Sequence, residues 1–139
     1  MIIPHHVHNS IKPVIVLCVC LLGTATALYA QERADALKLY RTGRSLDSAG
    51  RTDEAKTAYT DAISICVAEL EQNPRNMDSY TVYTWSLFRL HRYRETIAVC
   101  NEALKRAPDA RIIETLGEAY FYTNDYKESL RQMERYIDM

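Results

Sequence analysis

The sequence predicts an all-α protein built from three antiparallel helical hairpins, and two observations point to this fold class. Apolar residues recur every three or four positions from residue 31 onward, whereas strict alternation never lasts long enough to predict a strand. Residues with turn chemistry interrupt the pattern at short intervals, which forces neighbouring helices to run antiparallel. The chain has 139 residues, 47% hydrophobic and 25% charged, a composition that excludes a disordered, collagen-like or polytopic membrane chain.

The first 30 residues differ from the rest because they contain one Lys, no Arg and no acidic residue. The nine consecutive apolar residues Val14–Leu22 precede a run of small residues, which is the order typical of a secretory signal peptide. We expect cleavage after Ala30, with Ala27 as the alternative. The uncharged stretch 13–31 has 19 residues, close to the roughly 20 that span a bilayer, so an uncleaved anchor is the competing interpretation. Both interpretations predict export of the remainder, to the periplasm or cell envelope.

Residues 31–139 are predicted to form one helical domain. This part keeps 16 basic and 18 acidic residues, so it is slightly acidic and offers no basic surface for nucleic acid. Contact with a membrane is expected only through an uncleaved N-terminal segment. Cys66 and Cys100 are too few for a disulfide framework, and we favour two buried free thiols over a pair formed in an oxidising compartment.

Six amphipathic segments carry the predicted core. Thr52, Asp109 and Asp125 follow the predicted turns and are expected to cap the helices that come next. In chain order, the six apolar stripes are Ala36, Leu39, Gly43 and Leu46; Ala55, Tyr59, Ala62, Cys66 and Leu70; Tyr80, Tyr83, Leu87 and Leu90; Ile97, Cys100 and Leu104; Ile113, Leu116 and Tyr120; and Leu130, Met133 and Ile137.

The three hairpins are also copies of one another. Segments 50–55, 91–96 and 124–129 each follow a first helix, begin a second one, and end in Glu and a small residue. Successive copies are 41 and then 33 residues apart. This self-similarity predicts a repeat protein.

The repeats resemble the tetratricopeptide repeat family, whose period is about 34 residues. The most specific match is Leu116-Gly117-Glu118-Ala119-Tyr120 followed by Asn124-Asp125-Tyr126. The resemblance implies a short right-handed α-solenoid with repeats at about 32–74, 77–108 and 110–139. Further matches are Leu39, Gly43, Leu46, Ala55, Tyr59 and Ala62 in the first repeat, Tyr80, Tyr83, Leu87, Tyr93, Ala103 and Pro108 in the second, and Ile113 and Tyr136 in the third.

Two further expectations follow from the repeat pattern. Gly in the middle of a helix costs about 1 kcal/mol relative to Ala, so we expect the paired helix to approach Gly43 and Gly117 closely. The first spacing exceeds the family period by about seven residues, or two helical turns. We therefore expect the second helix of the first hairpin to continue through Cys66, Val67 and Leu70.

No catalytic constellation emerges, and we expect a non-catalytic protein without a metal or cofactor. His91 lies at a turn, where a solvated role is the better interpretation, and the chain has no glycine-rich phosphate loop and no paired metal ligands. His5, His6 and His8 fall in the export segment.

Binding chemistry is better supported. The resemblance implies that the first helices line a concave surface, and large aromatic residues outside the apolar stripes, next to Arg, are typical of interfaces. The alternative is that these rings fill gaps between repeats. The predicted groove residues are Tyr40, Arg44, Trp85, Phe88, Arg89, Arg111, Phe121 and Tyr122, and the family's other groove-facing places correspond to Leu37, Asp47, Asp78, Thr81, Glu114 and Glu118.

We therefore expect an exported adaptor that holds a peptide or protein partner in this groove. The residues of the chaperone-binding clamp found in one subgroup of the family are replaced, by Tyr40 and Arg44 and by Trp85. The alternatives are a module that self-assembles through Leu130, Met133 and Ile137, a piece of a longer repeat protein, and an accessory ligand-binding component of a transport system.

Overall fold

A computed structural model describes residues 35–139, and every regular element in that range is a helix. Residues 35–48 are helical and are followed by α2 (Thr52–Gln72), α3 (Met77–Arg89), α4 (Tyr93–Leu104), α5 (Ala110–Tyr122) and α6 (Tyr126–Ile137). The predicted all-α class is confirmed. The export segment predicted for residues 1–30 lies outside the described residues.

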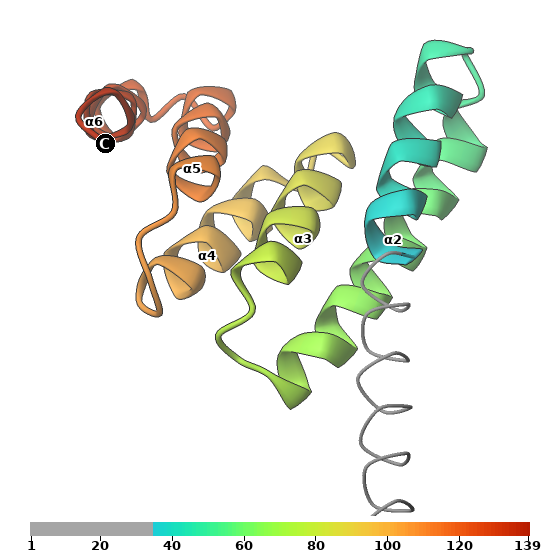
Figure 1. Cartoon of the computed structure of the whole chain (residues 1–139). Coiled ribbons are helices and arrows are strands. Elements are labelled where there is room, and N and C mark those ends of the chain that lie inside the picture. The colour runs from blue at the N-terminus through green and yellow to red at the C-terminus, as the bar shows by residue number, and fades with distance from the viewer. Residues whose placement is uncertain (1–34) are drawn as a thin grey trace, which may run out of the picture. The chain divides into compact units, whose positions relative to one another are not determined.

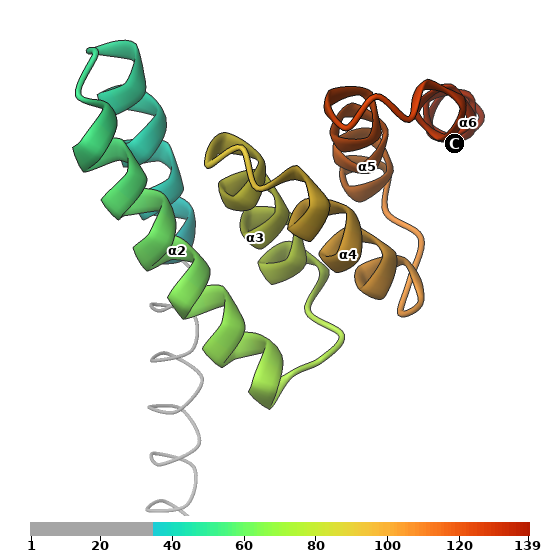
Figure 2. The same ribbon diagram turned by 180° about the vertical axis from the view of Figure 1, so that it is seen from behind.

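The helices form three hairpins that follow one another along the array (Figures 1 and 2). Residues 35–48 pair with α2, α3 pairs with α4, and α5 pairs with α6. Neighbouring hairpins meet where α2 packs on α3 and α4 packs on α5, and α3 also contacts α5. The first helices of the hairpins therefore lie next to one another.

The three hairpin turns share one backbone conformation. Gly50, His91 and Asn124 have φ of 75°, 59° and 65°, in the left-handed region. Each directly precedes the N-cap residue of the second helix of its hairpin. In each turn the next N–H donates to a carbonyl five residues back: Arg51 to Leu46 at 2.9 Å, Arg92 to Leu87 at 3.0 Å and Asp125 to Tyr120 at 3.0 Å. This bond closes the end of the first helix.

Two of the three predicted caps are confirmed. The carboxylate of Asp109 accepts from the backbone N–H of Arg111 at 2.9 Å, and that of Asp125 accepts from the N–H of Glu128 at 3.3 Å. The prediction for Thr52 is wrong, because α2 already includes it and Arg51 is the N-cap, with no side-chain cap bond.

Both mid-helix glycines mark close approaches, as predicted. A Cβ at Gly43 would lie 2.6 Å from the ring of Tyr59, and a Cβ at Gly117 would lie 2.8 Å from Cε of Met133. Tyr59 is 1% exposed and stands at the centre of the first core cluster, with Ala36, Ala55, Ala62 and Cys66. The missing side chains at the two glycines thus let these hairpins close.

Helix α2 has 21 residues, against 12 each in α4 and α6, which confirms the predicted extension. The carboxylate of Glu69, buried on this extension, accepts a hydrogen bond from the hydroxyl of Ser79 and one from the amide of Asn76 at 3.4 Å. These bonds hold the end of α2 against the start of α3.

Cys66 and Cys100 are free thiols and fully buried, in agreement with the favoured interpretation. Burial raises the pKa of both thiols to about 12. They therefore behave as small apolar side chains.

Two of the three residues of the last apolar stripe are exposed, as a self-assembly surface requires, whereas Met133 is not. On α6 the buried residues are Ser129 and Gln132, whereas Leu130 and Ile137 are 61% and 78% exposed. Met133 is half-buried against Gly117, so it does not share the exposed face of the other two. The physical reason is that no further helix in the part of the chain described here packs on that side of α6.

Candidate functional site

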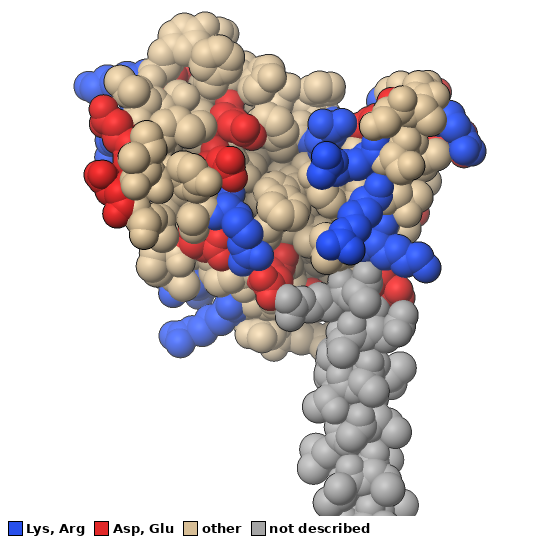
Figure 3. All heavy atoms as spheres, turned by 45° about the horizontal axis from the view of Figure 1, so that its top comes forward, with Lys and Arg blue, Asp and Glu red and all other residues tan. Residues whose placement is uncertain are grey.

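The three first helices together line a hollow of about 540 Å³. Residues 35–48 supply a tyrosine and an arginine, α3 supplies two aromatic rings and an arginine, and α5 supplies two carboxylates and a hydroxyl. We call this the charged hollow; its lining residues are Tyr40, Arg44, Trp85, Phe88, Arg89, Glu114, Thr115 and Glu118. In Figure 3, acidic side chains gather on the α5 side of the hollowed face and basic side chains on the side of residues 35–48.

Aromatic rings form the middle of the charged hollow. Tyr40 and Trp85 are in contact with ring centroids 5.4 Å apart, and Tyr40 also contacts Tyr59 at 5.8 Å. Tyr40 is buried, whereas Trp85 and Phe88 are half-buried. The sequence left open whether these rings fill gaps between repeats or line a binding surface. In the structure they pack between neighbouring hairpins and also line the hollow.

Arg89 is held in place by the first hairpin. Its guanidinium donates to Asp47 Oδ2 at 2.9 Å and to the hydroxyl of Tyr59 at 3.3 Å, and that hydroxyl donates to Asp47 at 2.8 Å. Desolvation tends to raise the pKa of Asp47, but the bonds from Tyr59 and Arg89 outweigh it, and the pKa is lowered. Burial, and then the bond to Asp47, raises the pKa of Tyr59 to about 12.

Arg44 is exposed, and among residues 35–139 no ion pair joins it to a carboxylate. It lies against Tyr40: burial raises the pKa of the Tyr40 hydroxyl, and the charges of Arg44 and Arg89 lower it. Arg44 is therefore the cation of this hollow that can meet a ligand without breaking an existing ion pair.

On the opposite wall, Glu114 and Glu118 lie one helical turn apart on α5. Neither takes part in an ion pair within the described range. Desolvation, followed by the negative charge of Glu114, raises the pKa of Glu118. Thr115, which the sequence did not single out, completes this wall; its hydroxyl donates to the backbone carbonyl of Arg111 at 2.8 Å.

Three of the eight predicted groove residues lie outside the charged hollow. Arg111 pairs with Asp109 at 2.7 Å and with Asp78 at 2.9 Å, so its charge joins the second and third hairpins. Tyr122 stacks on Tyr93 with ring centroids 4.7 Å apart. Phe121 is 56% exposed, and its ring contacts those of Tyr122 and Tyr126 with centroids 5.8 Å and 5.5 Å away.

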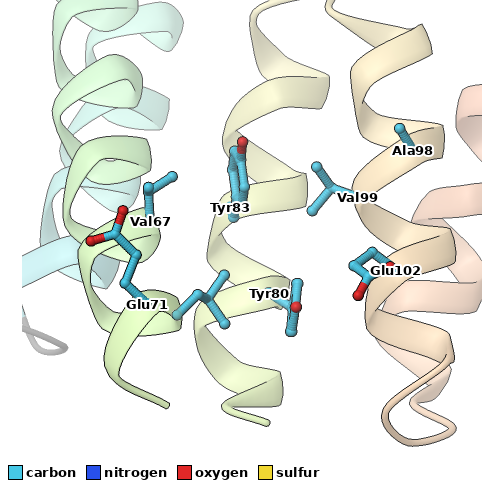
Figure 4. A pocket seen from close by; sticks show the side chains of 8 residues that line it. Val67, Glu71, Tyr80, Tyr83, Ala98, Val99 and Glu102 are labelled. Carbon is cyan, nitrogen blue, oxygen red and sulfur yellow. The ribbon is translucent and has the colours of Figure 1, made fainter. Parts of the chain in front are cut away.

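A second hollow, of about 450 Å³, lies between α2 and α4 over the other side of α3 (Figure 4). Two tyrosines of α3 stand at its middle, with side chains of α2 on one side and of α4 on the other. The sequence predicted the extension of α2 but not that it would wall a hollow. We call this the apolar hollow; its lining residues are Val67, Leu70, Glu71, Tyr80, Tyr83, Ala98, Val99 and Glu102.

The described residues form no candidate metal site. They contain no group of three His, Cys, Asp or Glu side chains that could hold a metal ion. His91 is exposed at its turn, with Nδ1 2.6 Å from the Tyr93 hydroxyl. Within residues 35–139, no helix is long and apolar enough to cross a membrane.

Residues 39–65 match the tetratricopeptide repeat family. Among solved structures, the first tetratricopeptide repeat domain of human RPAP3 is similar with a TM-score of 0.59 and 21% identity, covering 76% of this chain and 79% of that one. The corresponding domain of Arabidopsis FLU is similar with a TM-score of 0.53 and 16% identity, covering 77% and 95%. No curated protein matches the sequence.

These similarities agree with the repeats seen here, and residues 35–139 have the tetratricopeptide repeat fold. Arrays with this fold generally mediate interactions between proteins.

Proposed function

We propose that this tetratricopeptide repeat array is a non-catalytic adaptor that holds a segment of a protein partner in the charged hollow. The observation that carries the proposal is the hollow itself, which draws on all three hairpins and combines half-buried rings with charges. A volume of about 540 Å³ falls within the roughly 300–1,000 Å³ typical of ligand sites. Rings and Arg are the residue types that most often anchor interfaces.

The test is photo-crosslinking in the native cell envelope followed by affinity capture of the tagged chain. We compare wild type with the double variant Trp85→Ala, Phe88→Ala, which removes the rings of the charged hollow. Because Trp85 packs on Tyr40, a second variant, Arg44→Glu with Glu118→Lys, changes only exposed side chains and leaves the net charge unchanged.

Val67→Ser in the apolar hollow is the matched control, since it alters an exposed apolar side chain on the other side of α3. We expect a crosslinked partner with wild type and the control, and its loss in both charged-hollow variants. Equal recovery of every captured protein from all four chains would refute the proposal.

We also propose that the array works outside the cytoplasm. The support is the nearly uncharged N-terminal segment, with the apolar run Val14–Leu22 followed by small residues. Cell fractionation and N-terminal sequencing of the tagged protein test this directly. A new N-terminus after Ala30 or Ala27 indicates cleavage, an intact chain in the membrane fraction indicates an anchor, and an intact chain in the cytoplasm refutes export.

Self-association is the second candidate, and a specific observation favours it. Leu130 and Ile137 occupy the places on α6 that Ile97 and Leu104 occupy on α4, where they pack against the core cluster shared by the second and third hairpins. On α6 both side chains are exposed. Sedimentation at increasing concentration should show a dimer that Leu130→Ser, Ile137→Ser abolishes, and a wild-type monomer at every concentration would count against it.

A further inference from the structure

We propose that the charged hollow selects its partner segment by seating a lysine or arginine side chain between Glu114, Glu118 and the rings of α3, while Arg44 pairs with a carboxylate of the same segment. This inference rests on the proposed function, because it names the chemistry of the segment that the adaptor would hold. The bound segment would carry both signs of charge, in a fixed order along the hollow.

The acidic wall is the first step of the argument. Glu114 and Glu118 are four residues apart on one helix face, and like charges in that arrangement destabilise a helix. Desolvation, followed by the negative charge of Glu114, raises the pKa of the Glu118 carboxyl. No cation of the described range pairs with either carboxylate, so a cationic guest would relieve a repulsion that the free protein retains.

The aromatic floor is the second step. Trp85 and Phe88 line the same hollow as the two carboxylates, and both rings are half-buried. A cation over the face of such a ring is attracted by its electrons, and the methylene chain of a lysine or arginine covers apolar surface at the same time. The combination of ring and carboxylate suits a long basic side chain better than a purely apolar one.

The basic wall is the third step. Arg89 is already bonded to Asp47 and Tyr59, whereas Arg44 has no carboxylate partner in residues 35–139. Charges from both walls act on the Tyr40 hydroxyl. Burial and the negative charge of Glu118 raise the pKa of this hydroxyl, whereas the positive charges of Arg44 and Arg89 lower it. Arg44 and the two carboxylates thus line the same hollow as Tyr40, from different helices, and within residues 35–139 none of the three has an ion-pair partner. A segment with a basic and an acidic side chain matches both walls at once.

The test uses the full chain, immobilised in mild detergent, and a phage-displayed library of random short peptides as the probe. We compare the peptides that enrich on wild type, on Glu114→Gln with Glu118→Gln, and on Arg44→Gln. The control, Glu71→Gln with Glu134→Gln, removes two exposed carboxylates that line no part of the charged hollow. Circular dichroism checks that each variant is folded, which we expect because all these side chains are exposed.

We expect wild type and the control to enrich peptides with a Lys or Arg near an Asp or Glu. The glutamine pair on α5 should lose the basic preference, and Arg44→Gln should lose the acidic one. For one enriched peptide, replacing its basic residue by Met should weaken binding to wild type about tenfold, and much less to Glu114→Gln with Glu118→Gln.

Two results overturn the inference in distinguishable ways. Peptides that enrich equally on all charge variants, without a charge preference, would leave the adaptor function standing and refute the selection rule. No enrichment on wild type above the Trp85→Ala, Phe88→Ala variant would refute peptide binding in the charged hollow itself, and with it both proposals.

Discussion

Gly43 and Gly117 occupy the same place in the first and third hairpins, yet the structure predicts opposite effects for replacing each by Ala. In both cases an Ala gains about 1 kcal/mol of intrinsic helix stability over Gly. The difference lies in what the new methyl group meets. At Gly43 it would meet three ring atoms of Tyr59 at 2.6–2.9 Å.

The Tyr59 ring has no room to move. It is 1% exposed, and its hydroxyl is bonded to both Asp47 and Arg89. Overpacking of this kind costs roughly 1–3 kcal/mol, so the net loss for Gly43→Ala is up to about 2 kcal/mol after the helix gain of about 1 kcal/mol. For an array of this size, a loss of about 2 kcal/mol corresponds to a melting temperature lower by about 8–15 °C.

At Gly117 the methyl group would meet Cε of Met133 at 2.8 Å and Cβ of Gln132 at 3.4 Å. The first atom is the end of a flexible side chain on the partly open α6, and the second contact is ordinary. We therefore expect Gly117→Ala to be neutral or to stabilise the array by up to about 1 kcal/mol.

Urea denaturation followed by circular dichroism measures both changes in the free energy of unfolding. In the Tyr59→Leu background, which removes the obstructing ring atoms, the loss caused by Gly43→Ala should shrink by at least half its value. The reasoning is refuted if Gly117→Ala is as destabilising as Gly43→Ala, or if the Tyr59→Leu background leaves the loss unchanged.

Three further outcomes are expected. At Gly50, where φ is 75° and a Cβ would meet nothing within 4 Å, Gly50→Val should lose about 1–2 kcal/mol in urea denaturation and Gly50→Asn much less, because only the backbone conformation is at stake. The stability that Asp47 contributes should be complete above its ordinary pKa of 3.8 and lost as the pH falls through its lowered folded pKa. The unfolding free energies of wild type and Asp47→Asn should therefore converge below about pH 4, and a constant difference down to pH 2 would contradict the network. A thiol reagent at pH 8 should leave Cys66 and Cys100 unlabelled in the native protein and label both in urea, as located by mass spectrometry; rapid native labelling would contradict their burial.

The turns and the helix extension could be predicted because they depend on local sequence. The three copies beginning at Gly50, His91 and Asn124 were recognised from residue order, and the structure shows why that order recurs, since all three residues adopt the left-handed conformation. Periodicity identifies an apolar face, but whether that face is buried depends on a distant partner. On α6 the stripe through Leu130 and Ile137 has the right spacing, yet within residues 35–139 no helix packs against it.

Buried hydroxyl residues were missed for a different reason. Thr81, Thr84 and Thr96 are almost completely buried, although a search for apolar stripes passes over them. Each hydroxyl donates to a backbone carbonyl three or four residues earlier, at 2.8–3.0 Å, so it needs no partner from another helix. For Thr81 the groove-facing place implied by the family resemblance is wrong, because the side chain is 1% exposed and does not line the charged hollow. The bonds of Arg89 to Asp47 and Tyr59 were also not predicted, because they join residues 42 and 30 positions apart.

The extension of α2 limits how the length of this chain can change. Seven residues turn an α-helix by nearly two full turns, so Cys66 and Leu70 continue the face of α2 that begins with Ala55 and Ala62. An insertion or deletion of seven residues there keeps the loop to α3 leaving from the same side of the helix. A change of two or five residues rotates that exit by about half a turn and points α3 away from its neighbours. Length variation in this helix should therefore be tolerated in steps of whole turns.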